Sequence, residues 1–300
     1  MKKVLVTGCR GQLVTDLISH LIIKPDKYDV YHYDREGCDV TNYDKFSEIF
    51  YQHEPDIYIH GPSVHNVEEI HKDINKACEV NIGSLLVASN FCNTCDTTLV
   101  NFSTNYVHNG IAQHTYIQFE GYLKTTPAEP VNIYGITKIA GERIVSQTCK
   151  KYYNIRVSGV FGKTGSRAKN NDNFIYVILR GLEKNGKVEV VNDQTLNVTY
   201  TRDAANIIET ILDKTPTPGI YHAVNKGVVT WYDVAKFVAE TMGYDSSQVK
   251  PITTKDFYSD INRPKDTALS LRDTETKLNI DIPTWQSGVV RFLREIGEIR

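Results

Sequence analysis

The chain has 300 residues, a hydrophobic share of 41%, a charged share of 23% and a formal net charge of −2. These values are typical of a globular protein large enough to bury a sizeable core. They provide no broad positive field for nucleic acid or an anionic membrane, and no apolar run approaches the length of a bilayer span. We therefore expect neither of those partners, and a cytoplasmic location.

Short apolar strands and amphipathic helices alternate through the first half of the chain. We predict strands at residues 3–7, 29–33, 56–60, 98–102 and 153–157, and helices at residues 12–23, 43–51, 78–92 and 132–150. This alternation indicates βαβ units, and strands that are mostly apolar fit a parallel sheet covered on both faces. The predicted fold is a doubly wound α/β sheet of the Rossmann-like kind.

Beyond Phe161 the alternation loosens, which predicts a smaller C-terminal substrate-binding part. Residues 163–172 are polar and read as a loop, and further strands are predicted at 187–191 and 220–223. We expect an NAD(P)-binding domain of residues 1–162 and 187–222, and a smaller part of residues 163–186 and 223–300.

The stretch TGCRGQLV, residues 7–14, follows the first strand and contains two glycines. Gly8 suits a tight turn with positive φ, and Gly11 leaves room for phosphate oxygens at the N-terminus of the next helix. Val14 stands where a third glycine would let the helix pack closely on the strand. We therefore expect a pyrophosphate site whose altered residue affects packing more than binding.

The end of the second strand leaves the form of the cofactor open. Asp34 lies where an acid would bind the ribose 2′-hydroxyl of NADH. Arg35 follows it, where a cation would receive the 2′-phosphate of NADPH. The expected cofactor is therefore NADPH or NADH.

The stretch YGITK places Tyr134 and Lys138 four residues apart at the start of a predicted helix, on one face of it. A nearby ammonium favours a phenolate, so we expect Lys138 to lower the pKa of Tyr134. Thr104 ends the region of the fourth strand, at the edge where α/β sheets bind ligands. Together the three residues predict a proton-transfer site.

The six cysteines and nine histidines form no metal motif that we recognise. Cys92 and Cys95 make a single CxxC that ends a predicted helix, so free thiols are expected. His60, His65 and His71 are spaced by five and six residues, which puts them on no common helical face. We expect no metal site.

Five segments carry a family resemblance. They are VLVTGCRGQL (4–13), FSTNYVHNG (102–110), PAEPVNIYGITKIAGE (127–142), VNDQTLNVTYTRDAA (191–205) and NRPKDTALS (262–270). Together they resemble the dTDP-4-dehydrorhamnose reductase subfamily of the extended short-chain dehydrogenase/reductases. The resemblance implies NAD(P)H-dependent reduction of the 4-keto group of a nucleotide-activated 6-deoxy sugar, as in dTDP-rhamnose biosynthesis.

The resemblance also implies roles for single residues. The catalytic set would be Thr104, Tyr134 as proton donor, and Lys138. With Asp34 and Arg35 from the argument above, the cofactor-binding set would be Gly8, Arg10, Gly11, Gln12, Leu13, Asp34, Arg35, Asp39, Val40, Gly61, Pro62, Ser63, Tyr134 and Lys138. The substrate-binding set would be Val67, Thr104, Asn105, Tyr106, Gly159, Asn173 and Gln194. Arg167, Lys169 and Arg263 are candidates for the phosphates of the substrate.

The chain departs from the family pattern around the pocket. Residues 60–65 read HGPSVH in place of NAAAxT, Asn105 replaces an aspartate, His108 replaces a phenylalanine, and Gly159 replaces a tryptophan. With the catalytic set intact, this pattern favours a changed substrate over lost chemistry. We expect a sugar whose bulky substituent fills the space left at Gly159.

Two other functions remain open. A non-catalytic regulatory protein on the same scaffold, similar to the regulatory β subunit of methionine adenosyltransferase, would tolerate altered cofactor loops but would not need Thr104, Tyr134 and Lys138. An epimerase or dehydratase would share those residues, although a dehydratase would want an acidic pair where this chain has Asn105 and Tyr106. The expected partners are a nucleotide sugar and, as a working assumption, a second copy in a homodimer.

Overall fold

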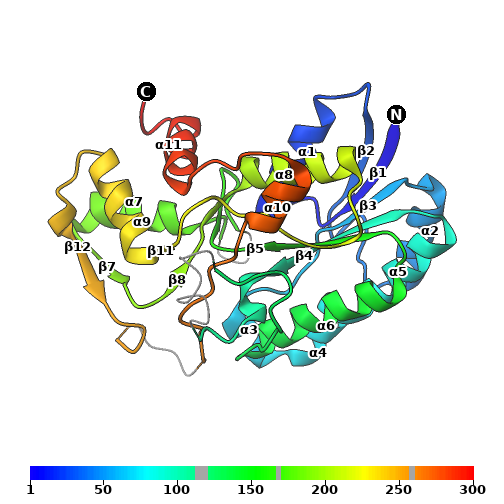
Figure 1. The fold of residues 1–300 in the computed structure, drawn as a ribbon, viewed down its shortest axis with the longest axis horizontal. Coiled ribbons are helices and arrows are strands. Elements are labelled where there is room, and N and C mark those ends of the chain that lie inside the picture. The colour runs from blue at the N-terminus through cyan, green and yellow to red at the C-terminus, as the bar shows by residue number, and fades with distance from the viewer. Residues whose placement is uncertain (112–120, 167–169, 257–260) are drawn as a thin grey trace.

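Figure 1 shows the computed structural model, which describes residues 1–111, 121–166, 170–256 and 261–300. One half of the molecule is a sheet between two layers of helices, and it contains the N-terminus. The other half is built from shorter strands and three helices and lies at the opposite end of the long axis (Figure 1).

Six parallel strands form the central sheet, in the order β10-β5-β4-β3-β1-β2. Their bounds are β1 (Lys2–Thr7), β2 (Tyr28–Tyr33), β3 (Ile57–His60), β4 (Thr98–Thr104), β5 (Tyr152–Val157) and β10 (Gly219–His222). The chain runs from β1 to β2 on one side and then returns to β3 on the other, so the strand order reverses at β1. This arrangement confirms the predicted doubly wound fold.

Helices cover both faces of the sheet (Figure 1). One face carries α1 (Gln12–Ile22), α8 (Thr201–Lys214) and α10 (Arg272–Leu278), and the other carries α2 (Tyr43–His53), α5 (Ser84–Thr94) and α6 (Ile133–Thr148). Strand β1 serves both layers, because Val4 and Val6 join the first core and Leu5 joins the second. Burial on both sides explains why the strands are apolar without alternation.

Val14, in place of the usual third glycine, packs inside the first core. A Cβ added to Gly61 would lie 2.9 Å from Cγ2 of Val14 and 2.4 Å from the carbonyl oxygen of Thr7. The valine side chain therefore occupies space that Gly61 leaves open at the end of β3. Helix α1 still approaches the sheet closely, because the residue without a side chain at this contact is Gly61 instead of residue 14.

The helix predicted at residues 78–92 is longer and less regular than expected. It comprises α4 (Ile74–Cys78), a π-helical segment (Glu79–Gly83) and then α5, with the short α3 (Val67–Lys72) before it. Local π-helical turns are frequent at functional sites. The periodicity of apolar residues gave no sign of this one.

The smaller half has its own hydrophobic core, which includes Phe161, Leu182 and Phe292. Its helices are α7 (Phe174–Asn185), α9 (Trp231–Thr241) and α11 (Trp285–Glu295). Its two-stranded sheets are β6 (Val160–Phe161) with β9 (Thr199–Tyr200), β8 (Thr195–Leu196) with β11 (Val229–Thr230), and β7 (Val188–Val191) with β12 (Val249–Ile252). Strand β7, which we had grouped with the cofactor domain, thus pairs outside the six-stranded sheet.

In the described part of the chain, Asn105–Val107 and Ser246–Gln248 each form a single turn of 3₁₀ helix. Among the residues that the structure describes, no helix has both the length and the apolar character of a membrane span.

Candidate active site

The strand reversal at β1 places two turns side by side at the carboxyl edge of the sheet, where doubly wound folds bind their ligands. Gly8 follows β1 with φ of +68°, and an added Cβ would lie 2.7 Å from the nitrogen of Pro62. Gly61 follows β3, and its amide donates to the carbonyl oxygen of Thr7. The turn therefore needs glycine at position 8 for two separate reasons, its dihedral angles and the contact with Pro62.

A cavity of 620 Å³ opens beside these two turns. Most of the predicted cofactor-binding residues line it: Gly8, Arg10, Gly11, Asp34, Arg35, Asp39, Val40, Gly61, Pro62 and Ser63. Sequence reasoning missed the other lining residues, which are Glu36, Cys38, Val64, His65, Asn66, Glu69, Lys76 and Val80. Gln12 and Leu13 lie buried in the first turn of α1 instead. A cavity of this size suits a cofactor or a drug-sized ligand.

The mouth of the cavity carries two arginine–carboxylate pairs. Arg10 lies 2.6 Å from Asp34, and Arg35 donates to Asp39 across 2.9 Å. Asp34 also accepts a hydrogen bond from the amide of Gly37 at 3.0 Å. Each carboxylate thus has a cation beside it, so this edge of the cavity offers partners for a ribose hydroxyl and for a phosphate.

The N-terminus of α1 points to an anion site. Gly11 is the N-cap residue and, among the described side chains, none caps the first turn. That turn contains no acidic residue, and Arg10 precedes it. Free amides and the positive end of a helix dipole bind phosphate. These residues therefore fit the pyrophosphate of a dinucleotide.

Thr104, Tyr134 and Lys138 meet at the same edge of the sheet. Thr104 is the last residue of β4, and Tyr134 and Lys138 lie in the first two turns of α6. The side chain of Thr104 interacts with the hydroxyl of Tyr134 and opposes the rise of its pKa. The ammonium of Lys138 lies 3.3 Å from Oγ of Ser63, a residue of the cavity. The structure thus brings the predicted catalytic set together beside the predicted cofactor site.

Asn132 fixes the start of α6. Its side-chain oxygen accepts from the amide of Gly135 at 2.9 Å, and its side-chain nitrogen donates to the carbonyl oxygen of Asn262 at 3.0 Å. The N-cap therefore also ties the helix to the C-terminal segment. This contact sets the height of Tyr134 over the end of β4.

The expected lowering of the tyrosine pKa was wrong. Burial raises the pKa of Tyr134 to about 12, and the hydrogen bond from Thr104 offsets only part of that effect. Burial also lowers the pKa of Lys138 to about 8, against the opposing field of Glu142. Desolvation outweighs the opposing interaction at both groups, with Thr104 at Tyr134 and with Glu142 at Lys138. Tyr134 is therefore protonated at neutral pH and can donate a proton.

Tyr106 lies beside Tyr134 and Val67 lies in α3, and their predicted contact with substrate stays a prediction. The ring of Tyr106 meets the ring of Tyr134 edge to face, with centroids 5.8 Å apart. Val67 is buried at the start of α3. Asn105 is also buried, but its amide donates to Oγ1 of Thr267 at 2.7 Å and its oxygen accepts from Thr104 at 3.1 Å. The Asn105 side chain is thus engaged within the protein.

Asn173 and Gln194 are held by the smaller half. Asn173 is the N-cap residue of α7, and its side-chain nitrogen donates to the carbonyl oxygen of Gly162 at 3.0 Å. Gln194 donates to Oγ1 of Thr254 at 3.0 Å. Both side chains have structural partners here, and their predicted contact with substrate stays a prediction.

The space we expected at Gly159 does not exist. A Cβ there would lie 2.9 Å from the carbonyl oxygen of Asn197 and 3.0 Å from both Leu196 Cδ1 and Val198 Cγ1. The residue also has φ of +51°, a conformation that favours glycine. The segment 196–198 therefore fills the position, because the smaller half packs directly against this turn.

Arg263, a candidate for substrate phosphates, pairs with Glu68 of α3, and its charge opposes the rise that burial causes in the pKa of Tyr106. It therefore joins the C-terminal segment to the residue beside Tyr134. The other two candidates, Arg167 and Lys169, lie outside the described residues.

Asn81 is a residue of the site that the sequence analysis missed. It lies in the π-helical segment, where its oxygen accepts from the amide of Val64 at 2.9 Å and from Oγ of Ser63 at 3.2 Å. Its nitrogen donates to Oγ1 of Thr137 at 3.0 Å. Asn81 thus links the loop after β3 to helix α6, and the irregular turn that aims it had no signal in the sequence.

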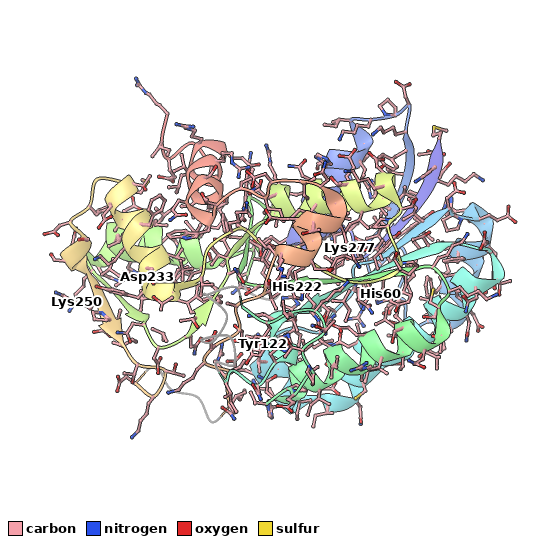
Figure 2. All side chains as sticks on the ribbon, viewed as in Figure 1. His60, Tyr122, His222, Asp233, Lys250 and Lys277 are labelled. Atoms are coloured by element: carbon pink, nitrogen blue, oxygen red, sulfur yellow. The ribbon has the colours of Figure 1, made fainter. Side chains whose placement is uncertain are left out.

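His60, one of the altered family positions, is buried at the end of β3. It is hydrogen-bonded to the hydroxyl of Tyr58 at 3.0 Å and lies 3.2 Å from Oγ of Ser84. Burial lowers its pKa to about 3. Figure 2 shows it within the sheet half of the molecule. Because its pKa is so low, His60 is a neutral packing residue at neutral pH. The six cysteines are free thiols, as expected.

Comparison with known proteins gives a consistent picture. The sequence model of the RmlD substrate binding domain matches residues 1–297. A spore coat polysaccharide biosynthesis protein of Bacillus subtilis is 30% identical, with 98% of each chain covered. A dTDP-4-dehydrorhamnose reductase of Aggregatibacter actinomycetemcomitans is 27% identical, over 95% of this chain and 96% of that one. A crystal structure of a dTDP-4-dehydrorhamnose reductase from Bacillus anthracis in complex with NADP superimposes with a TM-score of 0.87, 29% identity, and coverage of 98% and 99%.

Proposed function

This chain belongs to the RmlD substrate binding domain family, and on that premise we propose that it reduces the 4-keto group of a nucleotide-activated 6-deoxy sugar with NADPH or NADH. The observation that carries the proposal is the meeting of Thr104, Tyr134 and Lys138 beside the 620 Å³ cavity. A structure with similar topology binds NADP.

In this proposal Tyr134 donates its proton to the oxygen of the sugar carbonyl. A bound NADPH or NADH supplies hydride to the carbonyl carbon. The Thr104 hydroxyl, which donates to Oδ1 of Asn105 in this structure, would turn to donate a hydrogen bond to the same oxygen. The Lys138 ammonium, next to Ser63, offers donors to ribose hydroxyls and a positive charge that favours the phenolate left after proton transfer.

The cofactor would lie along the cavity from the N-terminus of α1 to Lys138. Gly8, Gly11 and the first amides of α1 would hold the pyrophosphate, and Gly61 to Ser63 would run beside it. Arg10 and Arg35, each next to a carboxylate, support binding of a 2′-phosphate as well as of a hydroxyl. We therefore propose NADPH or NADH and keep both in the test.

The identity of the sugar is proposed at the level of its class. The altered residues 60–65 and Asn105 led us to expect a relative of the rhamnose precursor, and the filled space at Gly159 removes one part of that argument. Substrate binding by the smaller half and assembly as a homodimer are carried forward as proposals. So is a cytoplasmic location, where nucleotide sugars would be available.

The regulatory alternative has less support. Val14 and Pro62 were its main grounds, and both pack into the turn without closing the cavity that Gly8 and Gly61 line. The meeting of Thr104, Tyr134 and Lys138 at one edge of the sheet is more than a binding scaffold needs.

The experiment has two stages. Fluorescence titration with NADPH and then NADH tests the cofactor site, and consumption of NADPH with a panel of nucleotide 4-keto-6-deoxy sugars tests the reaction. Tyr134→Phe should bind the cofactor normally but lose about 10²- to 10⁴-fold in kcat, because it lacks only the hydroxyl that donates the proton. Tight cofactor binding without turnover of any keto sugar would contradict the reductase proposal.

A further inference from the structure

A buried ion pair lies one helical turn from Lys138 of the proposed catalytic set. Arg156 of β5 donates from Nε and Nη2 to the two carboxylate oxygens of Glu142, at 2.9 and 2.8 Å. Both side chains are 2% exposed. Glu142 is on α6, one turn after Lys138, so the two side chains lie on the same face of the helix.

The pair is held firmly from the sheet side. Nη1 of Arg156 lies 3.4 Å from Nε2 of His108, and the ring of His108 stacks on Tyr122 with centroids 4.0 Å apart. Asn154 of β5 donates to the backbone oxygen of Glu142 at 3.2 Å. Tyr122 lies near the middle of the molecule in Figure 2, where the two halves meet. The carboxylate therefore cannot move away from Lys138 without breaking several buried contacts.

Stability alone is a weak reason for such a pair. Removing two charges from water costs as much as their attraction returns, and buried ion pairs can often be replaced by apolar residues without loss. The pair does affect a neighbouring charge. Burial lowers the pKa of Lys138, and the carboxylate of Glu142 opposes that effect.

The groups that face Lys138 are few. On its own helix they are Tyr134, which is neutral at pH 7, and Glu142. From β3 it is faced by His60, whose pKa of about 3 keeps it neutral. Arg156 acts through the carboxylate that it contacts, and His108 contacts Arg156. Within the described part of the chain, Glu142 is thus the negative charge that supports the ammonium.

We propose that Glu142 and Arg156 are positioning residues that set the charge of Lys138. The Glu142 carboxylate keeps the lysine protonated in a buried site, and the Arg156 guanidinium limits that effect and fixes the carboxylate in place. The consequence for catalysis rests on the function proposed above. The effect of Glu142 and Arg156 on the charge of Lys138 does not rest on that function, because it is a property of the protein without cofactor.

The test follows the ammonium itself. Protein labelled with ¹⁵N at the lysine side chains is titrated by NMR without cofactor, and the Lys138 signal is assigned by its loss in Lys138→Met. Glu142→Gln should move the titration of Lys138 to lower pH, by about one unit or more for a charge one turn away. Arg156→Gln should move it to higher pH, because the carboxylate is then opposed by no guanidinium.

A matched control separates charge from general damage. Asp203 of α8 and Arg291 of α11 form another pair with a buried carboxylate, at 2.6 Å, in contact with the smaller half. Asp203→Asn should lower stability and leave the Lys138 titration in place. Circular dichroism establishes that each variant is folded, and if Glu142→Gln is not, Arg156→Gln still carries the test.

An unchanged Lys138 titration in folded Glu142→Gln would overturn the inference, as would shifts of the two variants in the same direction. If the wild type turns over a keto sugar, the alkaline limb of its kcat/KM profile should move with the titration in each variant. If it turns over none, the proposed function fails, and the titration alone still decides the present inference.

Discussion

Placing a side chain at position 159 should destabilise the smaller half and its contact with the sheet. Gly159→Ala is the minimal change, since the family's tryptophan would add bulk to the same Cβ. The left-handed φ of +51° costs an alanine about 1 kcal/mol. The three contacts of 2.9 to 3.0 Å with residues 196–198 add about 1–3 kcal/mol of overpacking. We expect a total loss of about 2–4 kcal/mol.

The assay is urea unfolding followed by tryptophan fluorescence. The chain has 2 tryptophans: Trp285 lies in the core of the smaller half, which also contains Leu196 and Val198, and Trp231 packs against that core. Gly243→Ala is the matched control, because its φ is +79° and, among the described atoms, none lies within 4 Å of an added Cβ. That variant should lose only about 1 kcal/mol, the cost of the dihedral angle.

The comparison of the two alanine variants isolates the contact. A difference of about 2 kcal/mol would support the tight approach of residues 196–198. Equal losses in the two variants, or a tryptophan at 159 that is tolerated, would refute it and restore the open space that the sequence suggested.

Three further predictions concern charge. His60 and His222 have pKa values of about 3, below the ordinary value near 6.5, so stability should fall as the pH drops from 6.5 toward 3, by about 2 kcal/mol for each histidine at pH 5; urea unfolding at pH 7 and pH 5 measures this, and a His60→Asn variant that keeps the full pH dependence would contradict it. Because the pKa of Lys138 is about 8, its ammonium is lost above that pH, and kcat/KM for the proposed reduction should decline there; a profile that stays flat to pH 10 would argue against a role for the charge. Arg10→Ala and Arg35→Ala should each weaken NADPH about 10-fold and NADH less, since only NADPH offers a phosphate to the cation; equal losses for both forms in fluorescence titrations would remove these residues from the 2′-phosphate site.

The fold and the catalytic cluster could be predicted from local patterns in the sequence. Tyr134 and Lys138 were predictable from their spacing, and Thr104 from its place at the end of an apolar strand, because helices and parallel strands present side chains at fixed intervals. The order of the strands in the parallel sheet then brings their carboxyl ends to one edge, whatever residues connect the strands.

Most of the failures depended on contacts between distant segments, and one on an irregular turn within a helix. The pKa of Tyr134 follows from how much protein covers it, which no spacing reveals. Strand β7 was recognised as a strand, but its partner β12 lies about sixty residues further on in the sequence and was not foreseen. The space at Gly159 is closed by residues 196–198, and Asn81 is aimed by a π-helical turn.

The contact between Val14 and Gly61 has a consequence for recognising such sites. The close approach of helix and sheet needs one partner without a side chain, and here that partner follows the third strand instead of lying in the first helix. A glycine motif that covers only the turn after the first strand therefore scores this chain too low, although the close contact between helix and sheet is present. The two positions should vary together among relatives, with a small residue at one compensating for a larger residue at the other, so the motif is better written as a pair of segments than as a row of glycines.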